Sequence, residues 1–329
     1  MRYLLRRLGF FVLTLWAALT LNFFIPRFMP GSPLQALRDR THNRLSPAAL
    51  QEMLTSFGYR PNRNVLVQYF DYLGNMLTGH WGYSIGQALG TPVSTVVTQA
   101  LPWTLGLVGV ATILAFLLGS VIGVVAGWKR GGFVDSVLPS VFVITSALPY
   151  FWVALLLILV FSVWANGLLP SDFNYDNAIE PGMTGEFIGS VLQHAILPAA
   201  TILIASVGGW ILTMRNNMIT TLAEDYVRMA RAKGLSNQRI MYNYAARNAM
   251  LPNLSGFAMS LGFVISGAIL VEYVFNYPGL GYLLYNAVQN NDYPLMQVLF
   301  MLFTVAVLVA VLVCDFAIAW LDPRARAKG

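Results

Sequence analysis

The sequence predicts an all-α integral membrane protein with six transmembrane helices. Of its 329 residues, 57% are hydrophobic and 10% are charged, whereas about a quarter of the residues in soluble domains are charged. The composition also excludes a disordered chain, which requires low hydrophobicity. A helix needs roughly 20 apolar residues to cross a bilayer. Six stretches reach this length: Leu8–Phe28, Leu101–Trp128, Val137–Ala165, Ala195–Met214, Leu254–Val271 and Leu295–Leu321.

The first span has the basic start and the apolar run of a secretory signal peptide. Its apolar stretch is long, however, and Phe23–Arg27 offers no small-residue cleavage site. We therefore expect this span to be retained as a membrane anchor.

The segment Pro30–Ala100 is too long for a plain connector. Ser46 as N-cap and Pro47 at the first helical position predict one helix, with Gly58 as its end. After Asn64, apolar residues recur at helical spacing as far as Gly79 and predict a second, amphipathic helix. These helices either lie on the bilayer or cover the bundle, or they form a contact surface for an extracytoplasmic partner. The sequence leaves both interpretations open.

The segment Asn216–Leu251, between the fourth and fifth spans, predicts two further helices. Thr221 to Glu224 match a capping box, in which the hydroxyl and the carboxylate satisfy each other's backbone N–H groups. Gly234 is expected to end the first helix in a left-handed conformation. Ser236 can cap a second helix that runs to Pro252, where the fifth span opens.

These two helices predict a compact knob that projects from the membrane. Its first helix has one apolar face, which consists of Leu222, Tyr226, Met229 and Ala230. A basic amphipathic helix under a membrane can lie on anionic lipid. Alternatively, the knob inserts into a cleft on a cytoplasmic subunit, which suits a projecting helix–glycine–helix hairpin.

The basic residues predict the orientation of the chain, because cytoplasmic loops carry an excess of Lys and Arg. Of the 20 Lys and Arg residues, 14 fall on one side of the predicted spans: Arg2, Arg6, Arg7, Lys129, Arg130, Arg215, Arg228, Arg231, Lys233, Arg239, Arg247, Arg324, Arg326 and Lys328. Both termini are therefore expected in the cytoplasm. The five arginines within Pro30–Ala100 do not change this, since long loops translocate regardless of charge.

No constellation in the sequence is typical of catalysis or cofactor binding. His42, His80 and His194 lack the HExxH spacing, and neither a GxSxG elbow nor a GxxxxGK[ST] phosphate loop occurs. The single Cys314 excludes an internal disulfide framework and a Cys-rich metal site. Glycines at 119, 123 and 127 indicate close helix packing. We expect no cofactor, no metal and no nucleic-acid partner.

A transporter driven by protons or sodium ions normally has ionisable residues within its membrane spans. The interiors of the first five spans hold none, while Glu272 and Asp315 lie near span ends. A pore without such groups that still transports uphill must be driven by another subunit. The knob is the place where that force would arrive.

Several motifs together resemble one family, the permeases of ATP-binding-cassette (ABC) importers, in the branch that imports dipeptides, oligopeptides and nickel. The segment Asp225–Leu235 resembles the Glu-Ala-Ala loop of these permeases, and Arg247–Pro252 resembles the end of that loop. Where the generic loop begins with Glu, this chain has Arg228, as is usual in the peptide branch. Further similar segments are Arg6–Leu8, Pro30–Pro33, Val274–Gly281, Asn291–Pro294 and Asp322–Arg324.

The resemblance implies a type I ABC importer permease fold, with residues 1–329 as a single transmembrane permease domain and 216–251 as its cytoplasmic coupling loop. It implies a second, homologous permease, two ATPase subunits that hold ATP and magnesium, and an extracytoplasmic binding protein that delivers substrate. The residues that it assigns to coupling with the ATPase are Glu224, Asp225, Tyr226, Arg228, Met229, Ala230, Gly234 and Leu235.

Two alternatives remain at this stage. Members of the same branch also import nickel chelates and oligosaccharides, and nothing in the sequence separates these substrates from peptides. The other alternative is a different class, a stand-alone secondary transporter or channel.

Overall fold

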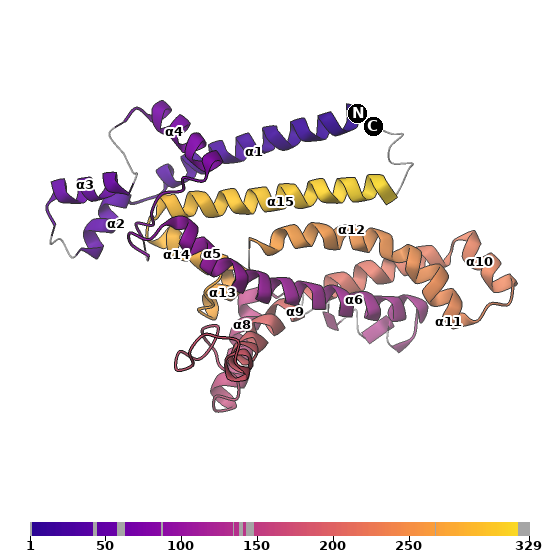
Figure 1. The fold of residues 1–329 in the computed structure, drawn as a ribbon. Coiled ribbons are helices and arrows are strands. Elements are labelled where there is room, and N and C mark those ends of the chain that lie inside the picture. The colour runs from indigo at the N-terminus through magenta and orange to yellow at the C-terminus, as the bar shows by residue number, and fades with distance from the viewer. Residues whose placement is uncertain are drawn as a thin grey trace. The chain divides into compact units, whose positions relative to one another are not determined.

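The computed structural model describes residues 2–41, 45–57, 63–86, 88–133, 135–137, 141–142, 148–266 and 268–321, with the side chains of 7–314 within these ranges. Within the described residues, the regular secondary structure is entirely helical, and one isolated β-bridge joins Tyr83 and Pro92 (Figure 1). It divides into two compact units. The first unit consists of Met1–Thr104, Ile265–Ile269 and Pro278–Gly329, and the second of Leu105–Val264 and Leu270–Tyr277.

Two long antiparallel helices, α1 (Arg2–Phe28) and α15 (Tyr293–Leu321), form the body of the first unit. The buried Asn22 on α1 donates from Nδ2 to the carbonyl oxygen of Gln297 on α15 at 2.7 Å. Apolar side chains from both helices, including Phe23 and Leu299, share one core with the helices α4 (Val65–Thr78), α5 (Val93–Thr104) and α14 (Leu280–Gln289). These contacts bury one apolar face of each of the two helices, which removes it from its surroundings.

The described residues between 30 and 90 form three short helices where two were predicted: α2 (Pro33–Arg40), α3 (Pro47–Ser56) and α4 (Val65–Thr78). Two predicted signals are confirmed, because the Ser46 side chain caps α3 and Gly79 ends α4, in a left-handed conformation. The Asn64 side chain caps α4, which was not predicted. Helix α3 already stops at Ser56, and Gly58 lies outside the described residues. Helix α2 was not predicted from the sequence.

The rest of the first unit is α5 (Val93–Thr104) and α14 (Leu280–Gln289). The backbone N–H of Leu280 donates to the buried Thr104 Oγ1 at 2.7 Å, which fixes the start of α14 to the end of α5. A π-helical turn (Leu105–Gly109) and α6 (Val110–Trp128) continue the same helical run into the second unit.

The second unit is organised around α9 (Gly185–Leu222), which packs along α6. The predicted close packing of the glycines is confirmed. A Cβ atom at Gly123 would lie 2.7 Å from the carbonyl oxygen of Ile211, and one at Gly119 would collide with Trp210 Cβ. Only glycine permits this approach, so the glycine face of α6 sets its distance from α9.

Two further helical runs pack on α9. Helix α8 (Tyr150–Ile158) continues into a π-helical turn (Leu159–Trp164), and α12 (Arg247–Val264) packs against both α9 and α6. The buried Asn253 on α12 donates from Nδ2 to Ser120 Oγ on α6 at 2.9 Å. Such a polar bond between apolar helices fixes their register in a membrane.

Four described helical runs are long and apolar enough to cross a membrane: Arg7–Phe28, Val93–Trp128, Gly185–Leu222 and Tyr293–Cys314. They contain the first, second and fourth predicted spans and most of the sixth. Only part of the third predicted span is described, and it includes the shorter apolar run Tyr150–Trp164. The fifth differs from its prediction, because α12 ends at Val264 and the chain becomes helical again at α13 (Ile269–Val274). Hydropathy alone does not detect this interruption.

Candidate functional site

The knob predicted from the sequence is built by the 216–251 segment of the second unit. Its first helix, α10 (Asp225–Ala232), follows α9 after a turn of two residues. The predicted capping box is wrong. Thr221 still belongs to α9 and lies near its end. Glu224 is the N-cap residue of α10, but its side chain makes no capping hydrogen bond. Its carbonyl oxygen accepts from the N–H groups of Val227 and Arg228 at 3.1 and 3.2 Å.

Helix α10 ends as predicted at Gly234, which has a φ of +73°. The N–H of Gly234 donates to the carbonyl of Arg231 at 2.9 Å, and that of Leu235 donates to the carbonyl of Ala230 at 3.3 Å. This pair of bonds is a Schellman motif, and Leu235 packs on Ala230 as is common in it. The stop is therefore fixed by backbone geometry that glycine adopts without strain.

The face of α10 that packs on the unit differs from the predicted one. Val227 and Ala230 are buried and form a small core with Ile240. Tyr226 and Met229, which were predicted on the apolar face, are 38% and 59% exposed. Leu222, the remaining member of the predicted face, belongs to α9 but packs on the same core. The predicted face is therefore right for Leu222 and Ala230 and wrong for Tyr226 and Met229.

The second helix of the knob is longer than predicted. Ser236 precedes it as expected, but α11 (Asn237–Arg239), a π-helical turn (Ile240–Ala246) and α12 continue without a break. Pro252 therefore lies inside a helix and does not end one. Prolines are tolerated in this way in helices of membrane proteins. Asn248 donates from Nδ2 to the Tyr226 hydroxyl oxygen at 3.0 Å and ties this helix to α10.

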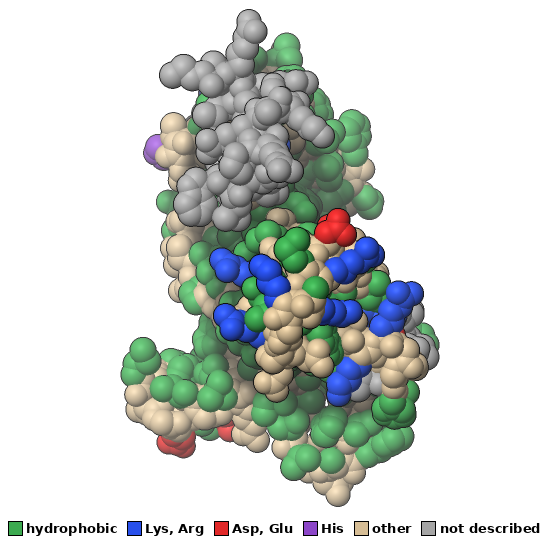
Figure 2. All heavy atoms as spheres, turned by 90° about the vertical axis from the view of Figure 1, so that its right-hand side faces the viewer, with side chains coloured by type: hydrophobic (Ala, Val, Ile, Leu, Met, Phe, Trp, Pro, Cys, Tyr) green, Lys and Arg blue, Asp and Glu red, His purple; other side chains and the backbone are tan. Residues whose placement is uncertain are grey.

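The knob lies at one end of the second unit (Figure 1), and Figure 2 shows that Lys and Arg side chains gather on this end. The exposed basic residues of the segment and of the turn after α6 are Lys129, Arg130, Arg228, Arg231, Lys233, Arg239 and Arg247. Among these basic residues, Arg228 has an acidic neighbour, since its Nη1 lies 3.6 Å from the Asp225 carboxylate. Since both side chains are exposed, this pair adds little stability.

The structure thus brings seven of the eight predicted coupling residues onto α10 and its C-terminal stop, and the eighth, Glu224, is the N-cap residue of the same helix. Glu224, Asp225, Tyr226, Arg228 and Met229 are exposed, and Ala230 faces the interior. Gly234 is exposed and Leu235 is half-buried. Val227 was missed, although its spacing of three residues from Ala230 is the signal of a helix face. Trp128, which packs on the same core, carries no local signal because it is about a hundred residues away in the chain.

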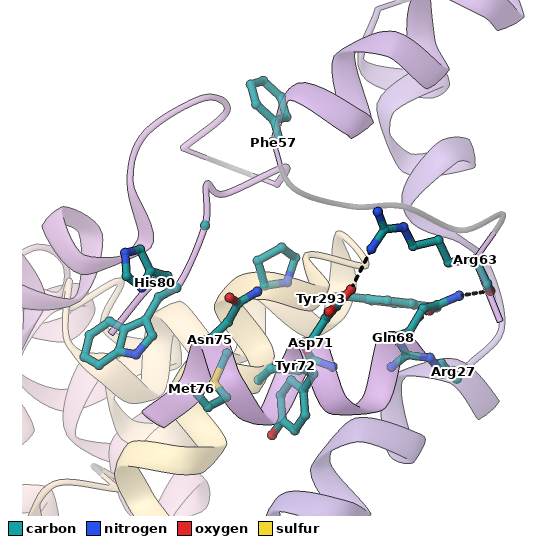
Figure 3. A pocket seen from close by; sticks show the side chains of 14 residues that line it. Arg27, Phe57, Arg63, Gln68, Asp71, Tyr72, Asn75, Met76, His80 and Tyr293 are labelled. Carbon is teal, nitrogen blue, oxygen red and sulfur yellow. Dashed lines mark hydrogen bonds and ion pairs between the residues drawn. The ribbon is translucent and has the colours of Figure 1, made fainter. Parts of the chain in front are cut away.

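A second candidate site lies in the first unit, where a cavity of about 400 Å³ opens beside α4. Figure 3 shows Arg63 and Asp71 joined at one end of this cavity and His80 at the other, with Tyr293 between them. The distance between Arg63 Nη1 and Asp71 Oδ2 is 3.0 Å. The volume falls within the range of small-molecule sites. Arg63 already pairs with Asp71, and Arg27 already donates to the Phe23 carbonyl and to Gln68 Oε1, so the geometry assigns the cavity no ligand.

The 30–100 segment is held to the turn between α14 and α15. Ser84 Oγ and the Gly86 N–H both donate to the buried Asp292 Oδ2, at 2.5 and 2.9 Å. Arg40 Nη2 donates to Asn290 Oδ1 at 3.0 Å. A Cβ atom at Gly86 would lie 2.7 Å from Asp292 Oδ2, so glycine is required there. The segment is therefore fixed to its own unit at both α2 and the 84–86 turn.

These features define a class: a helical membrane protein with a projecting, basic helix–glycine–helix knob. A family model described as the binding-protein-dependent transport system inner membrane component matches residues 119–327, and the chain belongs to this family. It is therefore a permease component of an ABC importer in the inner membrane.

Characterised relatives match nearly the whole chain. The oligopeptide transport system permease protein AppB of Bacillus subtilis is 34% identical over 322 residues, which cover 98% of each chain. The di/tripeptide transport system permease protein DppB of Pseudomonas aeruginosa is 32% identical over 98% of each chain. The dipeptide transport system permease protein DppB of Escherichia coli is 31% identical over 100% of this chain and 99% of its own. These relatives are permease subunits and not enzymes.

Proposed function

We propose that this chain forms, together with a second homologous permease, the membrane pathway for uptake of dipeptides or oligopeptides. The names of the relatives support this substrate class, since they describe oligopeptide, dipeptide and di/tripeptide transport. The chain itself would carry neither cofactor nor metal. ATP and magnesium would be bound by two ATPase subunits, and a separate extracytoplasmic protein would deliver the peptide.

The observation that carries the coupling role is the exposed face of α10. Val227 and Ala230 hold the helix on the second unit, which leaves Tyr226 and Met229 directed away from that core and exposed. An aromatic and a flexible thioether side chain on a rigid, projecting helix suit insertion into a cleft of a partner. We assign contact with the ATPase to Glu224, Asp225, Tyr226, Arg228 and Met229, and formation of the helix stop to Ala230, Gly234 and Leu235.

The proposal includes six spans within a single permease domain, residues 1–329, with both termini in the cytoplasm. Six spans place the 216–251 segment on the same side as the termini and the 30–100 segment on the opposite side. The basic residues then face the cytoplasm, as the positive-inside rule requires. The exposed basic side chains around the knob would also contact anionic lipid headgroups.

The test is reconstitution in vesicles of this chain with its partner permease, the two ATPases and the binding protein. Labelled peptides of two to five residues are offered beside a nickel chelate and an oligosaccharide. We expect ATP-dependent peptide uptake only from the complete assembly, and no ATP hydrolysis by this chain alone. Uptake of only the chelate or the oligosaccharide would contradict the substrate class. Hydrolysis by the isolated chain would contradict its role as a permease subunit.

A further inference from the structure

An ion pair between the buried Asp135 and the half-buried Arg215 fixes the turn after α6 to helix α9. Arg215 Nε donates to Asp135 Oδ1, Arg215 Nη2 donates to Asp135 Oδ2 at 3.1 Å, and the Gly131 N–H donates to the same Oδ2 at 2.8 Å. Asp135 is 9% exposed. The Arg215 guanidinium, as hydrogen-bond donor, holds the pKa of the Asp135 carboxyl below its ordinary value. The pair is therefore ionised at neutral pH, and its two parallel bonds fix the orientation of both groups.

The backbone of Arg215 is held by the same helix that leads to Asp135. A Cβ atom at Gly127 would lie 3.0 Å from the carbonyl oxygen of Arg215, and one at Gly123 would lie 3.1 Å from its backbone nitrogen. Gly131, with a φ of +79°, then turns the chain so that Asp135 returns to α9. Backbone and side chain of Arg215 are thus both fixed to the end of α6.

The same end of α6 also supports the knob. Trp128, the last residue of α6, packs on the core formed by Val227, Ala230 and Ile240. The guanidinium of Arg231 lies 5.8 Å from the centre of the Trp128 ring, within the range of a cation–π contact. Helix α6 therefore packs on α9 along its glycine face and contacts α10 through Trp128, while Asp135 ties the turn after α6 to α9.

We propose that Asp135 and Arg215 are positioning residues, which hold the turn after α6 on α9 so that a displacement of α10 moves this turn together with both helices. This inference rests on the proposed docking of α10 on the ATPase. If the pair is broken, the knob and its core remain intact and α10 still docks. Helices α6 and α9 stay packed through their glycine contacts, but a displacement of α10 no longer carries the turn after α6 with them, and hydrolysis becomes separated from transport.

The test uses the complete importer reconstituted in vesicles with its binding protein. Three quantities are measured: the ATPase that co-purifies with the chain, the number of peptides taken up per ATP hydrolysed, and the stimulation of hydrolysis by the binding protein. The probe is the labelled peptide that the wild-type complex takes up fastest. The variants are Asp135→Asn, Arg215→Lys, and the exchanged pair Asp135→Arg with Arg215→Asp. Glu186→Gln, at an exposed position on α9, is the matched loss of one carboxylate.

We expect the Asp135→Asn complex to retain the ATPase but to take up at least about fivefold fewer peptides per ATP hydrolysed. Fivefold is the lower end of the factors by which coupled sites typically affect each other. Arg215→Lys should show the same direction, because lysine cannot make the two parallel bonds. The exchanged pair should recover most of the ratio, and Glu186→Gln should match wild type. A purely structural pair would lower the amount of complex and leave peptides per ATP unchanged.

An unchanged ratio in Asp135→Asn or in Arg215→Lys overturns the inference, as does an exchanged pair that assembles with an uncoupled ratio. Should Asp135→Asn not assemble, Arg215→Lys supplies the same comparison with the charge retained. A wild-type chain that fails to bind the ATPase would instead refute the proposed function, which keeps the two failures distinct.

Discussion

Asp292 is the residue on which the position of the 84–86 turn depends most. It is fully buried, and its carboxylate accepts from Ser84 Oγ, from the Gly86 N–H and, at 3.3 Å, from the N–H of Leu295 at the start of α15. Asp292→Ala removes the acceptor for all three donors. An unsatisfied buried donor costs about 1–3 kcal/mol. We therefore expect this variant to lose at least about 2 kcal/mol of folding stability, seen as a lower unfolding temperature of the purified chain.

Two variants accompany this measurement. Asp292→Asn keeps one acceptor oxygen and should lie between Asp292→Ala and wild type, while Asp39→Ala removes an exposed carboxylate on α2 and should leave the unfolding temperature unchanged. Limited proteolysis should cut the 30–100 segment faster in Asp292→Ala. If Asp292→Ala unfolds at the wild-type temperature with the wild-type cleavage pattern, the carboxylate does not hold the segment.

Neither this carboxylate nor Asp135 could be identified from the sequence. Ser84 lies 208 residues from Asp292, and Arg215 lies 80 residues from Asp135. Short motifs predict an interaction when the partners are a few residues apart, as at a helix cap. For partners this distant the tertiary fold must be known first.

At the scale of single helices, the local signals were accurate at helix ends and failed at helix continuity. Ser46, Gly79 and Gly234 act as predicted because each bonds to backbone within a few residues. Ser32 and Pro33 start α2 with the same Ser–Pro signal as α3, so this helix could have been predicted. Thr221 and Pro252 gave wrong boundaries, since packing in the second unit extends α9 and α12 through them.

The helix stop at Gly234 allows a prediction about the function of the knob. No atom lies within 4 Å of a Cβ built there, so a substitution meets no neighbour and its cost comes from the positive φ alone. For a β-branched residue the left-handed conformation costs about 1–2 kcal/mol. Gly234→Val should therefore insert normally and still bind its partner permease, but lose co-purification of the ATPase and peptide uptake.

The matched control at this position is Gly234→Asn, because asparagine adopts the left-handed conformation readily. It should retain most of the uptake. If α10 instead lies on lipid, uptake should survive Gly234→Val and fall when Arg228, Arg231 and Lys233 are neutralised together. Normal uptake by Gly234→Val would therefore count against the coupling role of the knob.

For the whole molecule, apolar length was enough to predict the helical class and the four runs that could cross a membrane. The interruption after Val264 was not predictable in this way, because the flanking residues are as apolar as those of an unbroken span. The division into two units was not predictable either. It depends on Ile265–Ile269 and Pro278–Gly329 joining the N-terminal third of the chain, which is a property of tertiary packing.

The side of the membrane on which the knob lies is a prediction for the whole molecule. Asn177 and Asn237 are both exposed, and one unbroken helix, α9, separates the segments that contain them. Its 38 residues extend about 57 Å at 1.5 Å per residue, which exceeds the roughly 30 Å of a bilayer core. A single crossing by α9 therefore places the two positions on opposite sides.

The segment near Asn237 carries the basic residues and the segment near Asn177 carries acidic ones, so the positive-inside rule assigns Asn237 to the cytoplasm. Reporter fusions should read Asn177 as outside and Asn237 as inside, and the same compartment for both would contradict the six-span arrangement.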